Sequence, residues 1–255
     1  MDLLHIIILS VVEALTEFLP ISSTAHLILT SHILGIVQSE FVSTFEIAIQ
    51  LGAIGAVVVV YFKKILEDKQ LFYKACFGFI PTGILGLVVY KHIKILLNQS
   101  IVPVIALFIG GIVIIAVEYY FIKKKKDNFK REMTYKDAFI IGLIQSISMV
   151  PGVSRAAASI FGGMALGFNR EKAVEFSFLL AIPTMVAATG LDLAKSSHSF
   201  SQNQLMELLL GIVLSFVFAL FVIRWIMRFV KTNNFIYFGV YRIVISVIYY
   251  FIFIH

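Results

Sequence analysis

The chain has 255 residues, of which 60% are hydrophobic and only 14% are charged. Its mean hydropathy of +0.95 excludes an ordinary soluble domain and indicates an integral membrane protein. The net charge is +6, but the basic residues lie between the apolar runs rather than along one face, so we predict no nucleic-acid partner.

Several apolar runs approach the roughly 20 residues that a helix needs to cross the hydrocarbon core of a membrane. None of them alternates between apolar and polar residues as a barrel strand would. The sequence therefore predicts an all-α integral membrane protein. We expect six transmembrane helices, at residues 41–62, 71–90, 101–122, 173–194, 205–223 and 235–254.

Two further regions, residues 3–37 and 138–167, are apolar but interrupted near their middles. The interruptions read LPISSTAH and VPGVSRAAAS, and each combines a proline with polar residues. Neither half of either region is long enough to cross the membrane, and proline disfavours a continuous helix. We therefore predict two re-entrant helical hairpins, each of which enters and leaves the membrane on one side.

The lysines and arginines predict the orientation of the spans. Sixteen of the 21 lie in four loops, at residues 63–74, 123–137, 168–172 and 224–234, and three lie in two others, at 91–100 and 195–204. Because cytoplasmic loops carry the excess of basic residues, the first group is expected to face the cytoplasm. The first hairpin and both termini then lie on the outer side, and the second hairpin enters from the cytoplasm.

The elements repeat, since a hairpin followed by three spans occurs twice with opposite orientation. When Pro20 is aligned with Pro151, Ser23 falls on Ser154. Inverted repeats of broken helices commonly hold a site near the membrane midplane, where we expect the two hairpins to meet. The predicted membrane domain spans residues 1–255, with repeats of about 1–126 and 127–255.

The first hairpin carries Glu13 and Glu17, which lie one helical turn apart on the same face. Two carboxylates held close together in a low dielectric repel each other, which favours a shared proton or a cation between them. The pair is therefore a candidate general base or a candidate site for a hard metal ion. Alternatively, both side chains only keep a wet cavity hydrated.

Hydroxyl groups follow the first hairpin's proline, at Ser22, Ser23 and Thr24. One serine could simply cap the next helix. Three hydroxyls in succession exceed what a cap requires, and His26 is within helical reach of Ser23. Ser23 and His26 are therefore candidates for an activated nucleophile and its proton partner, although His26 alone would more often be a satisfied interior histidine.

The second hairpin places Ser154, Arg155 and Ser159 after a Pro-Gly turn. A guanidinium in the middle of a hairpin needs an anionic partner, and its planar fork suits a phosphate. We expect Arg155 to bind a phosphate together with the N-terminus of the helix that follows. Pairing of Arg155 with Glu13 or Glu17 is the alternative.

Three polar residues in the spans are weaker signals. Gln50 and Gln145 are candidates for lining a cavity, and Arg242 in the last span is a candidate to pair with a carboxylate or a lipid headgroup. For each of them a structural role is the preferred interpretation. Only Gln50 is counted among the predicted substrate-binding residues.

Taken together, these residues form two motifs, EALTEFLPISSTAHL and PGVSRAAASIFGG, with AIQLGAI and VYRIV as secondary agreements. In these motifs the chain resembles the undecaprenyl-diphosphate phosphatases of bacterial membranes, also called bacitracin-resistance proteins, over its whole length. The resemblance implies a multi-pass enzyme of the bacterial inner membrane. It implies removal of the terminal phosphate from undecaprenyl diphosphate, with a divalent cation, to recycle the lipid carrier of peptidoglycan synthesis.

The resemblance also assigns roles to residues. The expected catalytic residues are Glu13, Glu17, Ser23, His26 and Arg155, and the two glutamates are the expected ligands of Mg²⁺ or Ca²⁺. The expected substrate-binding residues are Ser22, Thr24, Ser154, Ser159 and Gln50. Ser23 is the favoured nucleophile and His26 the alternative. The chain departs from the usual family pattern at Ala156 and Ala157, where Ser and Gly are common.

A transporter or flippase of a polyprenyl phosphate lipid is the competing function, because inverted repeats of broken helices also build secondary transporters. On architecture alone, transport would be the preferred function. A carrier needs a clamp for the anion but no nucleophile beside a proton donor, so the residue set favours the enzyme. A homodimer is compatible with the sequence but not required by it.

Overall fold

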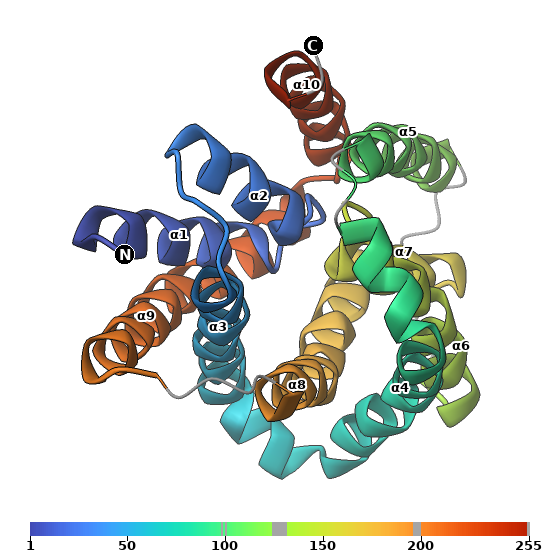
Figure 1. The fold of residues 1–255 in the computed structure, drawn as a ribbon. Coiled ribbons are helices and arrows are strands. Elements are labelled where there is room, and N and C mark those ends of the chain that lie inside the picture. Colours follow the sequence, from blue (N-terminus) through green and yellow to red (C-terminus); the bar gives the residue numbers. More distant parts are fainter. Residues whose placement is uncertain (98, 100, 124–131, 196–199, 254–255) are drawn as a thin grey trace.

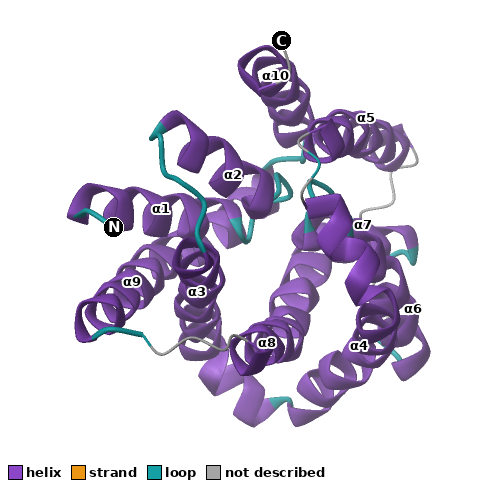
Figure 2. Cartoon of the chain, in the orientation of Figure 1, coloured by secondary structure: helices purple, strands orange, loops and turns teal. Residues whose placement is uncertain are grey.

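The computed structural model describes residues 1–255 except 98, 100, 124–131, 196–199 and 254–255 (Figure 1). Within these residues it contains ten α-helices and one short 3-10 helix, and it has no strand (Figure 2). The predicted all-α class is confirmed.

Five helices in the described part of the chain are long and apolar enough to cross a membrane. They are α3 (Glu40–Glu67), α4 (Lys69–Leu97), α5 (Ile101–Lys123), α8 (Arg170–Lys195) and α9 (Gln202–Thr232). A sixth apolar helix, α10 (Ile236–Phe253), is shorter. These six helices lie at the positions of the six predicted spans, and residue 254, the predicted end of the last span, lies outside the described residues. Helix α9 continues well beyond its predicted end, because the arginines and lysine that lower hydropathy there are good helix formers.

Each of the two interrupted regions forms helices joined by a turn. The first contains α1 (Leu3–Thr16) and α2 (Ser23–Ile33). The second contains α6 (Tyr135–Gln145), the 3-10 helix η1 (Ser146–Met149) and α7 (Arg155–Ala165). Within each region the helices pack against each other, so two helix–turn–helix units are present where hairpins were predicted.

The two turns break their helices for local reasons. Pro20 follows α1 and Pro151 follows η1, and a proline has no N–H with which to continue a helix. Ser22 then caps α2 and Ser154 caps α7. Each serine Oγ accepts a hydrogen bond from the backbone N–H three residues further on, at 3.5 Å for Ser22 and 3.1 Å for Ser154.

Helices α3 and α8 pack side by side in the middle of the bundle (Figure 1). Helices α1 and α9 pack beside α3, and α4 and α7 pack beside α8. Helix α6 packs on α4 and α7, whereas α5 and α10 form a pair of their own. The two turns meet in the interior, where Ser154 Oγ lies 3.5 Å from the Leu19 carbonyl oxygen. This contact brings together polar residues that lie more than 130 positions apart in the sequence.

An aromatic cluster anchors the first turn to the two central helices. The ring of Phe18 meets the ring of Phe178 edge-on, with 5.3 Å between their centroids, and Phe178 meets Tyr61 in the same way at 6.1 Å. Edge-to-face pairs of this kind are favourable beyond their buried area. The turn that carries Glu17 and Ser23 is therefore held against both α3 and α8.

Helices α4 and α6 approach each other so closely that their backbones touch. A Cβ atom added to Gly142 would lie 1.7 Å from the Gly78 carbonyl oxygen. Small residues allow such close packing between membrane helices. This contact fixes the second helix–turn–helix unit on α4.

Gly142→Ala is expected to lower the melting temperature of the purified protein in detergent, because overpacking of this kind costs about 1–3 kcal/mol. The matched control is Gly190→Ala, whose added Cβ meets no atom within 4 Å. Equal melting temperatures for the two variants would contradict the close contact of α4 with α6.

Candidate active site

A pocket of about 220 Å³ lies between the two turns and the central helices. It is lined by Glu17, Ser22, Ser23, Thr24, Gln50, Ser148, Gly152, Ser154, Arg155, Met185 and Ala188. Seven of the ten predicted site residues are in this set. The other three, Glu13, His26 and Ser159, do not line the pocket.

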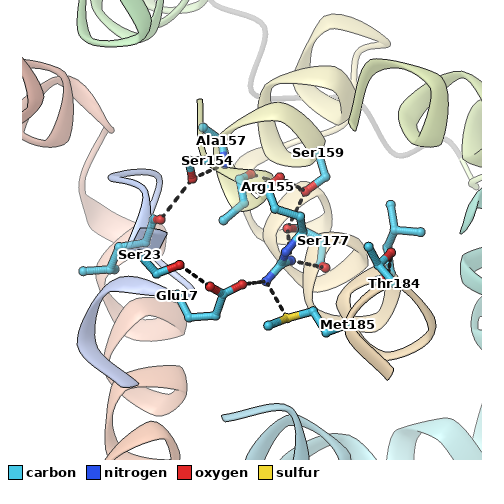
Figure 3. Close-up of polar contacts among 12 residues, drawn as sticks. Glu17, Ser23, Ser154, Arg155, Ala157, Ser159, Ser177, Thr184 and Met185 are labelled. Atoms are coloured by element: carbon cyan, nitrogen blue, oxygen red, sulfur yellow. Dashed lines mark hydrogen bonds and ion pairs between the residues drawn. The ribbon is translucent and has the colours of Figure 1, made fainter. Parts of the chain in front are cut away.

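The centre of the pocket is a hydrogen-bonded row that joins the two turns (Figure 3). Ser23 donates a hydrogen bond to Oε2 of Glu17, and Oε1 of Glu17 accepts one from Nη2 of Arg155 at 3.0 Å. The side chains of Arg155 and Glu17 are only 11% and 7% exposed, so water screens this ion pair less than a pair at the surface. Of the two expectations for Arg155, this arrangement is the pairing with a glutamate.

Ser177 and Ser159 orient the guanidinium of Arg155 (Figure 3). Its Nη1 donates to the carbonyl oxygen of Ser177 at 2.9 Å and to Ser177 Oγ at 3.3 Å. Ser177 Oγ is in turn 2.6 Å from Ser159 Oγ. Ser159 therefore supports Arg155 through Ser177. Ser177 was not predicted, because nothing in the sequence marks a single serine in an apolar helix.

Arg155 keeps one donor free for a ligand. Its Nε is buried and has no hydrogen-bond partner among the described residues. A buried donor without a partner is costly, and such groups often point to a ligand or an ion. The guanidinium therefore has one donor besides those that bind Ser177 and Glu17.

The capping serines have the same unusual backbone at both turns. Ser22 has a φ of 73° and Ser154 a φ of 78°, and they are the only non-glycine residues with positive φ in the described chain. Such conformations cost about 1–3 kcal/mol and persist only where the surroundings enforce them. Both α2 and α7 thus begin at the pocket, and helix N-termini favour anions.

The structure corrects the predicted alignment of the two turns by one residue. Ser22, and not Ser23, has the conformation and the capping role of Ser154. The reason is that the two turns differ in length: the cap follows Pro20 by two residues but Pro151 by three. The counterpart of Arg155 is consequently Ser23, so each repeat contributes a different reactive side chain at the same position.

Arg242 of α10 is fully buried and holds both turns. Nη1 donates to the carbonyl oxygens of Pro20 and Val153, each at 3.0 Å, and Nη2 donates to that of Gly152 at 2.8 Å. The carbonyl oxygens of residues 106 and 107 in α5 accept the remaining two bonds. Arg242 thus pairs with neither a carboxylate nor a lipid headgroup and has the preferred structural role, because three turn carbonyls and two carbonyls of α5 accept all five of its hydrogen bonds.

His26 is held by two hydrogen bonds outside the pocket. Its Nδ1 lies 2.7 Å from the carbonyl oxygen of Ser22, and its Nε2 lies 2.7 Å from the hydroxyl of Tyr241. The two rings also stack, with 5.5 Å between centroids and 10° between planes. The predicted hydrogen bond between Ser23 and His26 is not formed in this structure. Tyr241 was not predicted, although it lies in the VYRIV motif.

Glu13 is the strongest candidate for binding a cation. It is fully buried, and neither of its carboxylate oxygens has a hydrogen-bond partner in the described part of the chain. An unpaired buried carboxylate is costly, and a hard cation prefers oxygen ligands of this kind. No group of three potential metal-ligating side chains occurs among the described residues. Glu13 and Glu17 therefore fit a cation whose other ligands are substrate oxygens and water.

Arg242→Lys is expected to lower the free energy of unfolding in detergent by about 2–4 kcal/mol, since an ammonium group cannot reach five carbonyl oxygens and several would be left unpaired. Thermal unfolding measures the effect. The control is Arg224→Lys at an exposed position of α9, which is expected to leave stability unchanged. Equal stability of both variants would mean that Arg242 does not hold the turns.

The chain is similar to known proteins over nearly its whole length. The family model of the Bacitracin resistance protein BacA matches residues 6–248. An undecaprenyl-diphosphatase of Sulfurihydrogenibium sp. (strain YO3AOP1) is 50% identical over 98% of this chain and 99% of its own length. That of Aquifex aeolicus (strain VF5) is 48% identical over 95% of both chains, and that of Wolinella succinogenes is 47% identical over 98% of both. The chain belongs to the bacitracin resistance protein BacA family.

Proposed function

We propose that the chain hydrolyses undecaprenyl diphosphate to undecaprenyl phosphate and inorganic phosphate in the inner membrane of a bacterium. The observation that carries this function is the hydroxyl of Ser23, hydrogen-bonded to a carboxylate that also binds Arg155. A nucleophile beside a base and a phosphate-binding group is what phosphoryl transfer requires and what a carrier does not. The name undecaprenyl-diphosphatase of the similar proteins supports the enzyme over the transporter.

Substrate binding begins with an exchange of partners at Arg155. The terminal phosphate enters between the N-termini of α2 and α7, where backbone donors favour an anion. It accepts hydrogen bonds from Nε of Arg155, which has no partner in the described chain, and from Nη2, which it takes over from Glu17. Glu17 thereby loses its neutralising partner and becomes a better base for Ser23.

The reaction then proceeds in two steps. Ser23 Oγ attacks the terminal phosphorus, its proton passes to Glu17, and the bond from this phosphorus to the bridging oxygen breaks. Glu17 keeps this proton, and the lipid phosphate leaves as an anion on the side of phosphorus opposite Ser23. In the second step a water attacks the phosphoserine from that opposite side, its two protons leave with the inorganic phosphate, and Glu17 returns the stored proton to Ser23. Arg155 and the helix N-termini offset the charge on the transferred group.

Glu13 and Glu17 would hold the divalent cation, Mg²⁺ or Ca²⁺. A bound cation supplies positive charge that offsets the charge of the diphosphate. For His26 we propose a positioning role, because both of its ring nitrogens are already used by Ser22 and Tyr241. His26 as the nucleophile is the alternative.

For the membrane arrangement we propose six spans and two re-entrant hairpins in an inverted repeat, with both termini outside. The matched packing of α1 on α9 and of α6 on α4 supports this repeat, as do the two serine caps. The boundary between the repeats, at residues 126 and 127, lies outside the described residues, and so does much of the basic loop 123–137. The homodimer stays a prediction.

The test is release of inorganic phosphate from undecaprenyl diphosphate by purified protein in detergent with a divalent cation. Glu17→Gln, Ser23→Ala and Arg155→Ala are each expected to lower kcat by about a thousandfold or more, because each removes a group that acts on the transferring phosphoryl.

Ser10→Ala is the matched control for Ser23→Ala, since the Ser10 hydroxyl only bonds to the carbonyl oxygen of Ile6 within α1. It is expected to keep nearly full activity. Retention of activity by folded Ser23→Ala would overturn the proposed nucleophile. Translocation of lipid phosphate in liposomes, without phosphate release in detergent, would instead favour the transporter.

A further inference from the structure

A second cavity, of about 710 Å³, adjoins the phosphate pocket. We call it the α4–α8 groove, because residues 79–87 of α4 and 184–192 of α8 form its walls, with η1 beside them. Gln50, Ser148 and Ala188 line both this groove and the phosphate pocket. A ligand anchored by its phosphate in the pocket can therefore extend directly into the groove.

The lining of the groove is suited to hydrocarbon. Ile80, Ile84 and Leu87 lie along the α4 wall, and Ile84 and Leu87 are 58% and 65% exposed, so the groove is open along one side. Two glycines of the same wall, Gly83 and Gly86, leave its surface hollow. Its volume falls within the roughly 300–1,000 Å³ that is usual for pockets of small ligands.

Two hydroxyl groups in the groove are occupied by the protein itself, whereas Thr189 Oγ1 has no hydrogen-bond partner among the described residues and Asp192 also lines the groove. Thr82 donates to the carbonyl oxygen of Gly142 at 2.7 Å, and Thr184 donates to that of Leu180 at 2.7 Å. Nε2 of Gln145 donates to both threonine hydroxyls, at 3.3 and 3.1 Å. These hydroxyls are thus not offered to a polar ligand, and they join α4, α6 and α8 behind the groove.

We propose that the α4–α8 groove binds the isoprenoid units next to the diphosphate of the substrate. This inference rests on the proposed function, because the ligand must carry a phosphate at one end and a hydrocarbon chain at the other. Only the units nearest the phosphate fit, and the rest of the tail leaves through the open side. The groove therefore determines how strongly the enzyme prefers a prenyl chain to a short alcohol diphosphate.

A rival cavity of about 640 Å³ lies between α5, α6 and α7. It is also apolar, but none of its lining residues lines the phosphate pocket. The turn held by Arg242 separates this cavity from the phosphate pocket, and the donors of Arg242 are already hydrogen-bonded to carbonyl oxygens. A tail anchored at Arg155 therefore has continuity with the α4–α8 groove and not with this cavity.

Gly86→Leu tests the groove. An added Cβ at Gly86 would lie 3.4 Å from the mobile end of Met149, so the backbone accepts the side chain, which then fills the groove. Since each buried methylene contributes a factor of about four in affinity, we expect kcat/KM for undecaprenyl diphosphate to fall by about tenfold or more. The value for dimethylallyl diphosphate, whose single isoprene unit makes little use of the groove, should change less than about twofold.

Two controls carry the same kind of added side chain elsewhere. Gly190→Leu changes the outer surface of α8, where an added Cβ meets no atom within 4 Å, and Ala165→Leu narrows the rival cavity. Both should behave like the wild type with both substrates. Equal losses with both substrates for Gly86→Leu, no loss with either, or a loss specific to undecaprenyl diphosphate in Ala165→Leu would overturn the inference.

Photolabelling, which needs no turnover, distinguishes a failure of the groove from a failure of the proposed function. A non-hydrolysable prenyl diphosphate with a photoreactive diazirine on its second isoprene unit should label peptides of α4 or α8. Labelling of α5 or α7, or of no helix, would overturn the groove even if phosphate is released. Labelling of α4 or α8 by a protein that releases no phosphate would support the groove and refute the hydrolase.

Discussion

The rest of the site depends on the hydrogen bonds that the Arg242 guanidinium donates to both turns. A helix that breaks in the interior of a protein leaves carbonyl groups without helical partners, and these must be satisfied by other donors. Arg242 binds such carbonyls from both turns at once, so one side chain fixes the distance between the two serine caps. Gly110 makes this possible, because a Cβ there would lie 2.1 Å from Nη2 of Arg242. The strained backbone at Ser22 and Ser154 persists within this frame.

Within that frame the two halves of the chain contribute opposite charges. The first turn supplies Glu17 and Ser23, and the second supplies Arg155, so neither half forms the row of hydrogen bonds alone. In the proposed reaction a phosphate takes over Nη2 of Arg155 from Glu17, and the same exchange leaves the Glu17 carboxylate as the base for Ser23. Binding of the substrate and activation of the nucleophile are thereby linked through one side chain. The α4–α8 groove adds a hydrocarbon site at the edge of this pocket, beside Gln50.

Much of this architecture could be predicted, and the exceptions have physical reasons. Hydropathy and two prolines predicted the helices and the breaks, because both act locally along the chain. The motifs predicted Ser23 and Arg155. The partners of Arg242 could not be predicted, since backbone carbonyls leave no trace in a sequence. The contact of His26 with Tyr241 joins residues 215 positions apart, so no local pattern indicates it. Helical spacing placed His26 near Ser23 but could not tell which way its ring turns.

The proposed reaction requires that Ser23, oriented by Glu17, forms the bond to the transferred phosphorus. A single turnover of the wild-type protein with substrate labelled in its terminal phosphate, stopped in both acid and alkali and mapped by mass spectrometry, tests this step. We expect the label on Ser23, and none on the protein in Ser23→Ala. Label on His26, or product formed with no labelled residue at any time, would contradict the proposed reaction.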